Sequence, residues 1–588
     1  MDVNALFARA ERAFAAGQHA SVRADLREVL RLVGEHPAVL HLAALNESRA
    51  GDAGAARVAF ARALSAAPTD AQILNNFANF LKQQGDLPAA LGHYDRALQA
   101  APNLHQARLN RAILLNSMSR HEDARRDADL LMVALPGDAA VRQTSGAIHL
   151  ALGAIEAAAA DFDAVLAQNP QDLKALHGRA RAAAIGGEEA RAIGLYRAAL
   201  GLAPDDGDLL IGLAEALEAA GEAEAAAPLA AAVAARPDWV EGHGALARMQ
   251  AEAGAGAEFD AAWRVAIAAR PADLALALGH VGCLLASAMP QQALAALDRM
   301  APLHGNRPEF HLYSAMAAVD AGDSERAAAA LAQAGALPGT ELTRARLALQ
   351  QGDPVQARDL LAPLVAAAPD DVVLWANLDL AWRLLGDDSH YWLSGQPGLV
   401  STQEIEYEGD WQQLAQVLRG LHRARSHPIG QSLRGGTQTR GRLFGRPEPE
   451  IATLGRAIMA AVSRHLAALP PADARHPLLR DRHRTPHFSG SWSVRLVGEG
   501  FHVAHIHPAG RLSSACYIVL PDGLDAAGAP GWLEVGGPPA ELALDLKPLH
   551  LIRPQPGRLA LFPSTLFHGT RPFPAGERLT VAFDVMLR

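Results

Sequence analysis

The chain has 588 residues, and its 53 Lys and Arg residues nearly balance its 63 Asp and Glu residues. This length is too great for one hydrophobic core, so we expect two or more domains. The formal net charge of -10 argues against a nucleic-acid-binding protein that works through an overall basic surface. No apolar run reaches the roughly 20 residues that cross a bilayer, and the first residues are charged and amphipathic, unlike a signal peptide. We therefore expect a cytoplasmic protein with no nucleic-acid or membrane partner.

The apolar residues favour helices over strands. Half of the residues are hydrophobic but only 5% are aromatic, and Ala and Leu recur at helical spacing. This composition predicts a mainly helical chain with any sheet confined to one part. The only cysteines, Cys283 and Cys516, lie far apart in regions of different composition. They offer neither a disulfide framework nor a cysteine-based zinc site.

A period of 34 residues organises the first half of the chain. Prolines recur at that step, at Pro68, Pro102, Pro136, Pro170 and Pro204. Small and aromatic residues return in the same phase before them, as in Ala56, Phe60 and Ala63. Small residues let two helices approach, and proline ends the second helix because it cannot donate a main-chain hydrogen bond. The pattern resembles the tetratricopeptide repeat, a pair of antiparallel helices, and we expect ten to eleven repeats in an all-α superhelix over residues 1–387.

Such an array has a concave face that usually binds a peptide or protein. Asn76 and Asn110 occupy the same phase of successive repeats and resemble the asparagine ladder by which the repeats of O-GlcNAc transferase hold peptide backbones. The equivalent positions in the next two repeats are Thr144 and Gly178, so the two asparagines are either groove contacts or solvated helix residues. We expect a protein or peptide partner in the groove, unless the array is an oligomerisation or spacer arm.

The Ala-Leu periodicity stops near residue 388, and the chain becomes rich in glycine, serine and aromatic residues. We expect a linker over residues 388–412 and a second domain over residues 413–588. Two helical stretches, about 410–422 and 450–469, precede short runs with strand chemistry. These runs are SWSVRLV, HVAHIH, SSACYIVL, GWLEVG, HLIRP, GRLALFP and RLTVAFDVML. Short strands separated by Pro-Gly turns predict a jelly roll or a closed double sheet.

Three histidines of the second domain are candidate metal ligands. His505 and His507, in HVAHIHP, are two residues apart, so on a strand both side chains leave one face while His502 leaves the other. His568 follows the strand that ends at FPS, where the return strand of a jelly roll can bring it beside the pair. Two imidazoles on one face can share a metal ion, and this order of strands predicts a third.

A candidate anion site lies in RLTVAFDV. On a strand, Arg578, Thr580 and Asp584 share one face, and apolar residues make the other. The apolar face can pack on helices while the polar face lines the barrel interior. An arginine that points into such a pocket needs an anion to offset its burial.

This order of motifs resembles the Fe(II)/2-oxoglutarate-dependent dioxygenases. The similarity is closest to a bacterial family of 2-oxoglutarate oxygenases with an HIHP-type motif and covers about residues 420–588. The matching stretches are QSLRGGTQT, HIHPAGRLSSACYIVLP, GWLEVGGPP and FPSTLFHGTRPFPAGERLTVAFDV. The resemblance implies a double-stranded β-helix, or jelly roll, with flanking helices, which uses Fe(II) and the cosubstrate 2-oxoglutarate.

The resemblance makes His505, His507 and His568 the iron ligands. The sequence departs from the family pattern at one of them, because the usual triad is two histidines and one carboxylate, H-x-D, and His507 stands at the carboxylate position. A neutral third ligand removes a negative charge, which should weaken Fe(II) binding. Two interpretations stay open: a three-histidine triad, or His505 and His568 joined by a carboxylate from elsewhere, such as Asp584 or Glu534.

The resemblance also makes Arg578 and Thr580 bind the distal carboxylate of 2-oxoglutarate, with Tyr517 as a further contact to the cosubstrate. Arg434, in QSLRGGTQT, is either an anchor of its loop or a substrate contact. The implied reaction is oxidative decarboxylation of 2-oxoglutarate to succinate, coupled to hydroxylation of a C–H bond. Because repeats are attached, we expect a protein or peptide substrate held in their groove. The alternative is a non-catalytic scaffold or adaptor with a degenerate barrel, which His507 favours.

Overall fold

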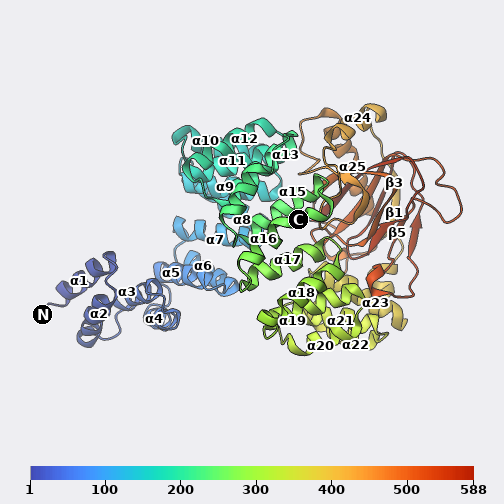
Figure 1. Ribbon diagram of the computed structural model, residues 1–588. Helices are drawn as coiled ribbons and strands as arrows, with labels where there is room; N and C mark the ends of the chain where they lie inside the picture. The colour runs from blue at the N-terminus through green and yellow to red at the C-terminus, as the bar shows by residue number, and fades with distance from the viewer. Residues whose placement is uncertain (1, 588) are drawn as a thin grey trace. The chain divides into compact units, whose positions relative to one another are not determined.

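The computed structural model describes residues 2–587, which divide between Ala182 and Ala183 into two compact units. The first unit is helical throughout. The second contains further helices and then all the strands of the described chain (Figure 1). Within residues 2–587, no helix combines the length and the apolar character needed to cross a bilayer.

Helices α1 to α23 follow one another with short turns, and within each unit successive helices pack against one another, as α1 does on α2 and α12 does on α13. Taken two by two in chain order, the described helices number eleven pairs with α23 left over, which is compatible with the predicted ten to eleven repeats. Their bounds are α1 Val3–Ala15, α2 His19–Val33, α3 Pro37–Arg49, α4 Ala53–Ala66, α5 Ala71–Gln83, α6 Leu87–Ala100, α7 His105–Ser117, α8 His121–Ala134, α9 Ala139–Leu152, α10 Ile155–Gln168, α11 Leu173–Ile185, α12 Glu189–Leu202, α13 Gly207–Ala220, α14 Ala227–Ala235, α15 Val240–Glu252, η1 Gly256–Glu258, α16 Ala261–Ala269, α17 Leu274–Ala286, α18 Pro290–His304, α19 Pro308–Ala321, α20 Ser324–Gln333, α21 Thr340–Gln350, α22 Pro354–Ala367 and α23 Val372–Leu385.

The recurring prolines end the second helix of each pair, as predicted. Ala67 and Ala101, the residues before Pro68 and Pro102, leave the helical conformation with φ of -141° and -139°. A residue that precedes proline avoids the α region, so each helix stops there. An aspartate then begins the next helix in many repeats. Asp70, for example, accepts hydrogen bonds from the first main-chain N–H groups of α5.

Aromatic residues fill the space that small residues leave between the helices. Phe60 is fully buried, as are Ala56 and Ala63 on the same helix. In a later repeat, a Cβ atom added to Gly178 would come within 2.3 Å of the ring of Phe162. The small residues of the period are therefore required by the aromatic packing.

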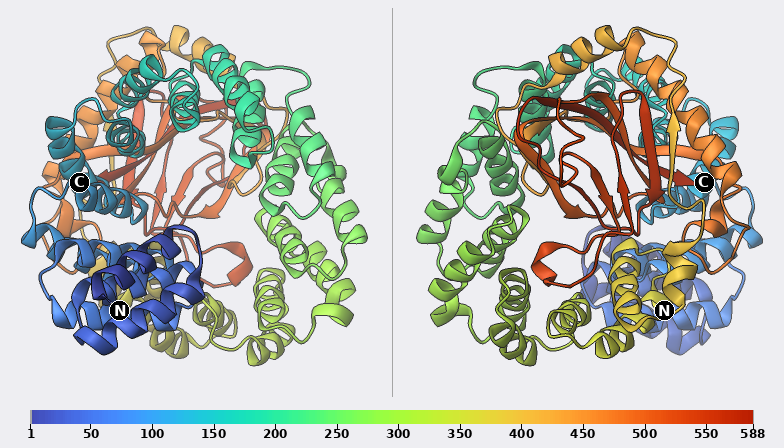
Figure 2. Two further views of the ribbon diagram at one scale, coloured as in Figure 1. Left: turned by 90° about the vertical axis from the view of Figure 1, so that its left-hand side faces the viewer. Right: turned by 90° about the vertical axis from the view of Figure 1, so that its right-hand side faces the viewer.

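The strands of the second unit form one antiparallel sheet in the order β1-β7-β4-β9-β3-β8-β5-β6, with β2 paired to β3. The sheet is curled, which agrees with the predicted jelly-roll domain (Figure 2). The bounds of the strands are β1 Ser401–Glu404, β2 Leu433–Gln438, β3 Pro486–His505, β4 Leu512–Val519, β5 Leu533–Val535, β6 His550–Ile552, β7 Arg558–Pro563, β8 His568–Thr570 and β9 Glu577–Leu587.

Helices α24 (Trp411–Leu421) and α25 (Pro449–Ala468) confirm the two predicted helical stretches. The apolar face of α25 packs against the sheet, where Leu454 and Ile458 meet a core that includes Leu579 and Val581 of β9. In Figure 2 this helix is drawn in orange beside the red strands. The residues of β9 that alternate with these apolar ones, Arg578 and Thr580 among them, face the other side, as predicted. The core thus lies between helix and sheet, and the polar side chains line the interior.

The strands differ from the prediction in three respects. SWSVRLV and HVAHIH belong to one long strand, β3, which pairs with β2 on both sides of a register shift at the glycines between them. The stretches QSLRGGTQT and HGT form β2 and β8, which alternation alone did not indicate. Residues 401–404, inside the predicted linker, form β1 and pair with β7. The domain boundary near residue 388 stays a prediction.

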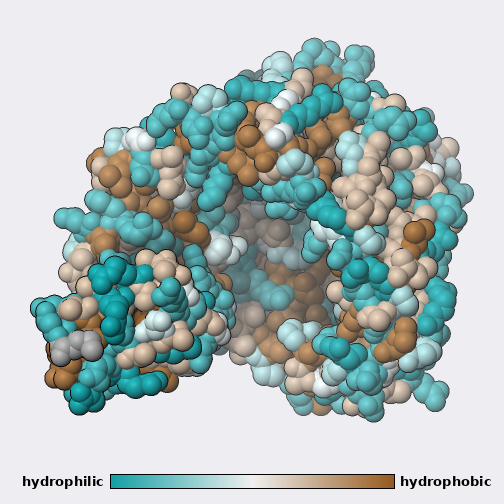
Figure 3. All heavy atoms as spheres, turned by 60° about the vertical axis from the view of Figure 1, so that its left-hand side comes forward, coloured by the Kyte–Doolittle hydropathy of each residue, from teal (hydrophilic) through white to brown (hydrophobic). Residues whose placement is uncertain are grey.

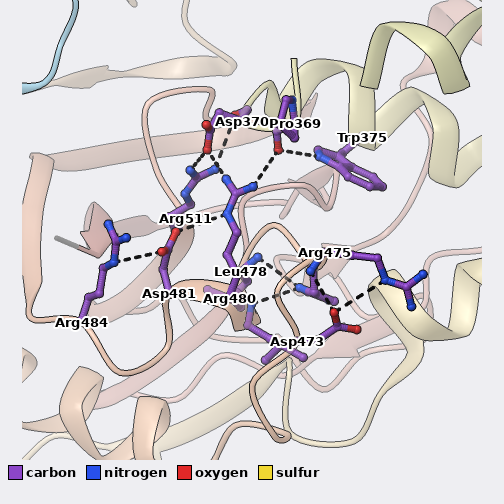
Figure 4. A network of polar contacts seen from close by, with 12 residues as sticks. Pro369, Asp370, Trp375, Asp473, Arg475, Leu478, Arg480, Asp481, Arg484 and Arg511 are labelled. Atoms are coloured by element: carbon purple, nitrogen blue, oxygen red, sulfur yellow. Dashed lines mark hydrogen bonds and ion pairs between the residues drawn. The ribbon is translucent and has the colours of Figure 1, made fainter. Parts of the chain in front are cut away.

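Ion pairs join the last repeats to the sheet domain within the second unit. Asp370, in the turn between α22 and α23, receives the guanidinium groups of Arg480 and Arg511. Figure 4 shows both arginines pointing toward this carboxylate. Trp375 Nε1 donates to the adjacent Pro369 carbonyl at 3.0 Å. The last turn of the repeats is thereby attached to two separate loops of the domain that follows.

An apolar contact joins the same two parts. Leu542, in the short helix η4 (Ala540–Leu542), is fully buried against Ala348 and Leu349 of α21. Nearby, Arg383 of α23 donates to the main-chain carbonyls of Gly536 and Lys547. The sheet domain is therefore packed on α21 and α23 and is not suspended on a linker.

Large apolar residues are exposed at several places on the described surface. Val58 of α4 and Val265 of α16 are exposed singly, whereas Leu130 and Val133 lie one turn apart on α8. On the face drawn in Figure 3, hydrophilic and hydrophobic residues are interspersed. Single exposed apolar residues are normal for folded proteins and indicate no binding site by themselves.

Candidate functional site

The three predicted ligand histidines come together. His505 ends β3, His507 lies two residues beyond it, and His568 begins β8, directly opposite His505 in the sheet. One ligand nitrogen from each of the three rings lies within 4.8 Å of the others. Among residues 2–587 this is the one cluster of His, Cys, Asp or Glu side chains with such spacing. The cluster can hold a metal ion.

The local backbone explains how the cluster forms. The pairing of β3 with β8 shifts register between His502 and His505, and the strand ends at His505. His507 therefore reaches the site from the following loop and does not share a strand face with His505. The same irregularity overturns the prediction that His502 leaves the opposite face. Its ring lies 5.8 Å from that of His505, and it lines the same cavity.

Two of the imidazoles are fixed by main-chain carbonyls. Nδ1 of His505 lies 2.9 Å from the carbonyl of Val503, and Nδ1 of His568 lies 3.1 Å from that of Leu566. A carbonyl can only accept, so each Nδ1 carries the proton and each Nε2 keeps its lone pair. This is the form of histidine that binds a metal ion through Nε2.

The third imidazole is fixed by a carboxylate. Nδ1 of His507 donates to Oδ1 of Asp584 at 2.6 Å, and Ser513 Oγ donates to the same oxygen at 3.2 Å. Asp584 is only 5% exposed. A buried negative charge thus lies directly behind one ring of the cluster, on the side away from His505 and His568.

The ligand nitrogens of the cluster face one another. Nε2 of His505 lies 2.9 Å from Nε2 of His507, while Nδ1 of each ring is already engaged by an oxygen acceptor. A cation between the two Nε2 atoms would be bound by both rings. Burial lowers the pKa of His505 to about 3 and holds that of His568 well below its usual value, so both stay neutral at physiological pH. The donor set fits Fe(II), which accepts imidazole ligands.

A buried cation lies in the same cavity. Arg578 is 3% exposed and donates through Nη1 to the Gly531 carbonyl. No carboxylate within residues 2–587 pairs with it, and burial lowers its pKa. Thr580, the next residue on this face of β9, lines the cavity with Arg578 and the three histidines. An uncompensated buried guanidinium fits an anionic ligand.

Tyr517 offers a second feature that fits an anion. It lies opposite Thr580 in the sheet, and the centroid of its ring is 5.2 Å from the guanidinium carbon of Arg578. The ring is fully buried, and its hydroxyl group has no hydrogen-bond partner in the described chain. Burial raises the Tyr517 pKa to about 12, so the hydroxyl keeps its proton and can donate it. A carboxylate beside Arg578 would satisfy both groups.

Neither of the carboxylates considered in the sequence takes the place of His507. Asp584 contacts Nδ1 of His507, the nitrogen that points away from the other two rings. Glu534 instead accepts a hydrogen bond from Arg571 Nε at 2.7 Å. The arrangement therefore favours three imidazoles at the centre of the cluster.

Sequence reasoning missed one contact of the site. Ser432 Oγ lies 2.9 Å from Nδ1 of His502 and 3.1 Å from Nε2 of His505. The serine belongs to QSLRGGTQT, which the family resemblance includes, but no spacing rule relates it to a histidine 70 residues later. Arg434 of the same block donates through Nη1 to the carbonyls of Gln431 and Leu433, both at 2.8 Å, and so anchors its own loop.

The two predicted groove asparagines have partners within the repeats. Asn76 Nδ2 lies 2.9 Å from Nε2 of His41, and Asn110 Nδ2 donates to Oδ1 of Asn75 at 3.0 Å. Gln106 donates to Asn110 in turn. These bonds link neighbouring repeats to each other. A peptide contact at Asn76 or Asn110 stays a prediction.

A family model matches this part of the sequence. Residues 490–584 match the model described as "Putative 2OG-Fe(II) oxygenase", and they include all three clustered histidines and Arg578. This part of the chain is therefore similar to that oxygenase family. The match covers most of the sheet of the oxygenase domain, from β3 to β9. The comparison with curated proteins found no match.

The helical part is similar to solved repeat proteins. A tetratricopeptide repeat protein from Parabacteroides merdae is 16% identical, with 52% of this chain and 96% of that chain covered and a TM-score of 0.29. PilF of Pseudomonas aeruginosa is 16% identical, with 35% and 94% covered and a TM-score of 0.32. The Cut9-Hcn1 hetero-tetramer of the APC/C is 14% identical, with 65% and 84% covered and a TM-score of 0.33. The assignment of the repeats here rests on their period and helix pairs.

Proposed function

We propose that this protein is an Fe(II)/2-oxoglutarate-dependent dioxygenase that hydroxylates a protein or peptide substrate captured by the repeats. The observation that carries the proposal is the cluster of His505, His507 and His568, whose Nδ1 atoms are all engaged by oxygen acceptors and whose ligand nitrogens lie within 4.8 Å of one another. The oxygenase family match over residues 490–584 supports the same class of reaction.

Bound Fe(II) and 2-oxoglutarate supply an oxidative decarboxylation, in which one atom of O2 enters succinate as CO2 leaves and the other becomes a hydroxyl group on the substrate. His505, His507 and His568 would hold the metal through imidazole nitrogen atoms, and the cavity that they line would give the cosubstrate access to it. Three ligands on one side leave room for a bidentate 2-oxo acid and O2.

The distal carboxylate of 2-oxoglutarate fixes the orientation of the cosubstrate. Arg578 and the hydroxyl groups of Tyr517 and Thr580 bind the distal carboxylate, which offsets the burial of the guanidinium group. Because these residues lie on paired strands, their positions are set by the sheet and not by a mobile loop. Apolar side chains such as Trp492 and Leu533 line the cavity and help to exclude water.

Asp584 supports the metal ligand that departs from the family pattern. It fixes the orientation of His507, holds the proton on Nδ1 and places a negative charge one ring away from the metal position. A carboxylate behind a histidine ligand raises the basicity of that ligand. The three-histidine site therefore keeps a carboxylate within reach of the metal, although not as a direct ligand.

The repeats are assigned to substrate capture. Eleven helix pairs precede the oxygenase domain, and such arrays bind peptides or proteins along their concave face. We place the protein in the cytoplasm, since Cys283 and Cys516 are free thiols and a reducing compartment keeps thiols in that form.

The proposal is tested by succinate release from 2-oxoglutarate by the purified full-length protein with added Fe(II) and O2. We expect slow release without substrate, faster release with the natural substrate, and none from Arg578→Gln at low 2-oxoglutarate. Calorimetric titration of 2-oxoglutarate in the absence of O2 tests cosubstrate binding separately. A non-catalytic scaffold would release no succinate and bind neither Fe(II) nor 2-oxoglutarate, and that result would reject the proposal.

A further inference from the structure

A second cavity adjoins the candidate iron site. It has a volume of about 180 Å³ and lies between the ends of repeat helices α15 and α17 and the loop that leads into β2. Gln431 of that loop lines both this cavity and the one that holds the histidine cluster. The two cavities therefore share one lining residue and are neighbours.

The loop between the cavities is held on both sides by main-chain hydrogen bonds. On the repeat side, Gly430 N donates to the carbonyl of Ala286 at 3.0 Å, and Ser426 N donates to that of Glu252 at 3.1 Å. On the oxygenase side, Val503 N donates to the carbonyl of Ser432 at 3.0 Å. A molecule in the second cavity thus contacts a rigid segment that is bonded to the strand carrying His505.

The lining of the second cavity combines large apolar residues with uncharged polar ones and one arginine. Its large apolar residues are Phe259, Met289 and Ile429, and its polar ones include Ser287, Ser426 and His427. No aspartate or glutamate lines it, and within residues 2–587 no carboxylate forms an ion pair with Arg434, whose side chain reaches the cavity. Nη1 of Arg434 bonds to carbonyls of its own loop, and the other nitrogen atoms of its guanidinium group remain available to an anion. Burial lowers the pKa of this arginine, a cost that a bound carboxylate would offset.

We propose that this cavity is a substrate subsite for a peptide, in which a bulky apolar side chain enters between Phe259 and Met289 while Arg434 binds an acidic residue beside it. The residue to be hydroxylated then lies on the other side of Gln431, at the iron site. The inference rests on the proposed function and adds the class of substrate: an acidic peptide with a large apolar residue near the modified position.

An extended peptide suits this arrangement better than a compact molecule. Side chains two positions apart on an extended chain leave the same face about 7 Å from each other. Such a chain can fill two neighbouring cavities that share one lining residue. The repeats thus supply one wall of the subsite through α15 and α17, in addition to any contacts along their groove.

A pair of matched variants tests the apolar part of the subsite. Ala286 is the exposed last residue of α17 and lines the cavity, whereas Ala367 is the exposed last residue of α22 and does not. Peptides are selected from a randomised 12-residue phage library on the full-length protein loaded with Mn(II) and 2-oxoglutarate. We expect Ala286→Trp to lower the affinity for the selected peptides at least tenfold and Ala367→Trp to leave this affinity unchanged. Equal binding to both variants would overturn the subsite.

A charge reversal tests the acidic part. The parent should select peptides with Asp or Glu next to a large apolar residue, and Arg434→Glu should reject these and select Lys or Arg at the same position. Selection without acidic residues, or selection of no peptide at all, would overturn the inference. Succinate release is measured on the same samples. If the parent selects acidic peptides but releases no succinate, the proposed reaction is contradicted. If the parent releases succinate but Ala286→Trp and Arg434→Glu select the same peptides as the parent, the subsite alone is contradicted.

Discussion

His507 donates through Nδ1 to Asp584 at 2.6 Å, and this bond identifies a carboxylate that the H-x-H motif lacks. In the usual triad the carboxylate binds the metal itself. In the proposed site, the imidazole of His507 takes that place, and Asp584 lies behind it on β9, where it also accepts a hydrogen bond from Ser513. The site therefore keeps a carboxylate charge, but this charge is separated from the proposed metal position by the ring of His507.

This relationship predicts that Asp584 and His507 are energetically coupled. We expect Asp584→Asn to lower Fe(II) affinity by about 10- to 100-fold, because asparagine can still accept the hydrogen bond but carries no charge. His507→Asp should retain or tighten Fe(II) binding, since it restores a direct carboxylate ligand. In the His507→Asp background, Asp584→Asn should cost little or improve binding, because it removes one of two adjacent negative charges.

The coupling is measured by titrating Fe(II) anaerobically into the parent, the two single variants and the double variant. Such a cycle isolates the interaction between the two positions. Equal effects of Asp584→Asn in the presence and absence of His507 would show that Asp584 acts only on the stability of the fold.

His568→Ala should abolish Fe(II) binding, because this residue is the one ligand that the return strand contributes. His502→Ala is the matched control. His502 lines the same cavity, but its Nδ1 is bonded to Ser432 and it lies outside the cluster of ligand nitrogens. The iron content of each variant is measured after dialysis. We expect iron in His502→Ala and none in His568→Ala, and full iron occupancy in His568→Ala would show that this residue is not a ligand.

Arg578→Gln should raise the 2-oxoglutarate concentration needed for half-maximal succinate release by more than tenfold while Fe(II) stays bound. The variant loses a charge-assisted pair in a closed pocket, and glutamine cannot replace the planar guanidinium group. Arg571→Gln serves as control, since Arg571 pairs with Glu534 at a more exposed position. If the control variant shows the larger change, Arg571 and not Arg578 is the anchor.

The oxygenase domain should lose stability below neutral pH because of buried histidines outside the metal site. His476 is fully buried, donates through Nε2 to the Leu393 carbonyl and accepts at Nδ1 from the N–H of Leu478, and burial lowers its pKa to about 4. The unfolded chain, with a histidine pKa near 6.5, binds more protons than the folded one between about pH 6.5 and 4. Stability is therefore full above about pH 6.5 and falls as the pH drops toward 4.

Urea unfolding at a series of pH values measures this dependence, with the fluorescence of Trp392, whose ring lies 5.1 Å from that of His476, as the signal. The slope between pH 6.5 and 4 should become smaller in His476→Gln and stay the same in His483→Gln, since His483 is exposed. An unchanged slope in His476→Gln would assign the acid sensitivity to other groups.

A truncation before residue 183 should preserve the oxygenase domain better than one at residue 388. Residues 183–588 form one compact unit, and removal of residues 183–387 would expose Leu542 and leave Arg440 without its buried partner Glu252. Losing one partner of a buried ion pair is strongly destabilising. We expect the 183–588 fragment to bind Fe(II) and to melt cooperatively. The 388–588 fragment should melt at a much lower temperature, and equal melting temperatures would show that the repeats do not support the domain.

Local patterns were sufficient to predict the repeats. The 34-residue period rests on short-range rules, since a proline such as Pro68 ends the helix before it. The alternation in β9 likewise placed Arg578 and Thr580 on the inner face, because a strand has a period of two. His568 was placed beside the pair by the expected return strand of a jelly roll and not by any local pattern.

The rest depends on where distant segments pair. The orientation of His502 and the path of His507 are set by the register shift between β3 and β8, which follows from the whole sheet and not from HVAHIHP. The contact of Ser432 with His505 requires β2 to lie beside β3, and β2 contains two glycines in six residues that hide its strand character. The packing of the oxygenase domain on α21 and α23 has no signature in either segment.

The pairing of β1 with β7 also has a consequence for the order of folding. Ser401 lies opposite Leu561, so an edge of the sheet closes only after 160 further residues have been added to the chain. The helix pairs, in contrast, make their contacts between immediate neighbours and can form as soon as each pair is complete. During synthesis the helical segments therefore fold early, and the oxygenase domain waits for its last strands. Late closure keeps strand edges exposed on the ribosome, and a chaperone requirement would arise in this domain before it arises in the repeats.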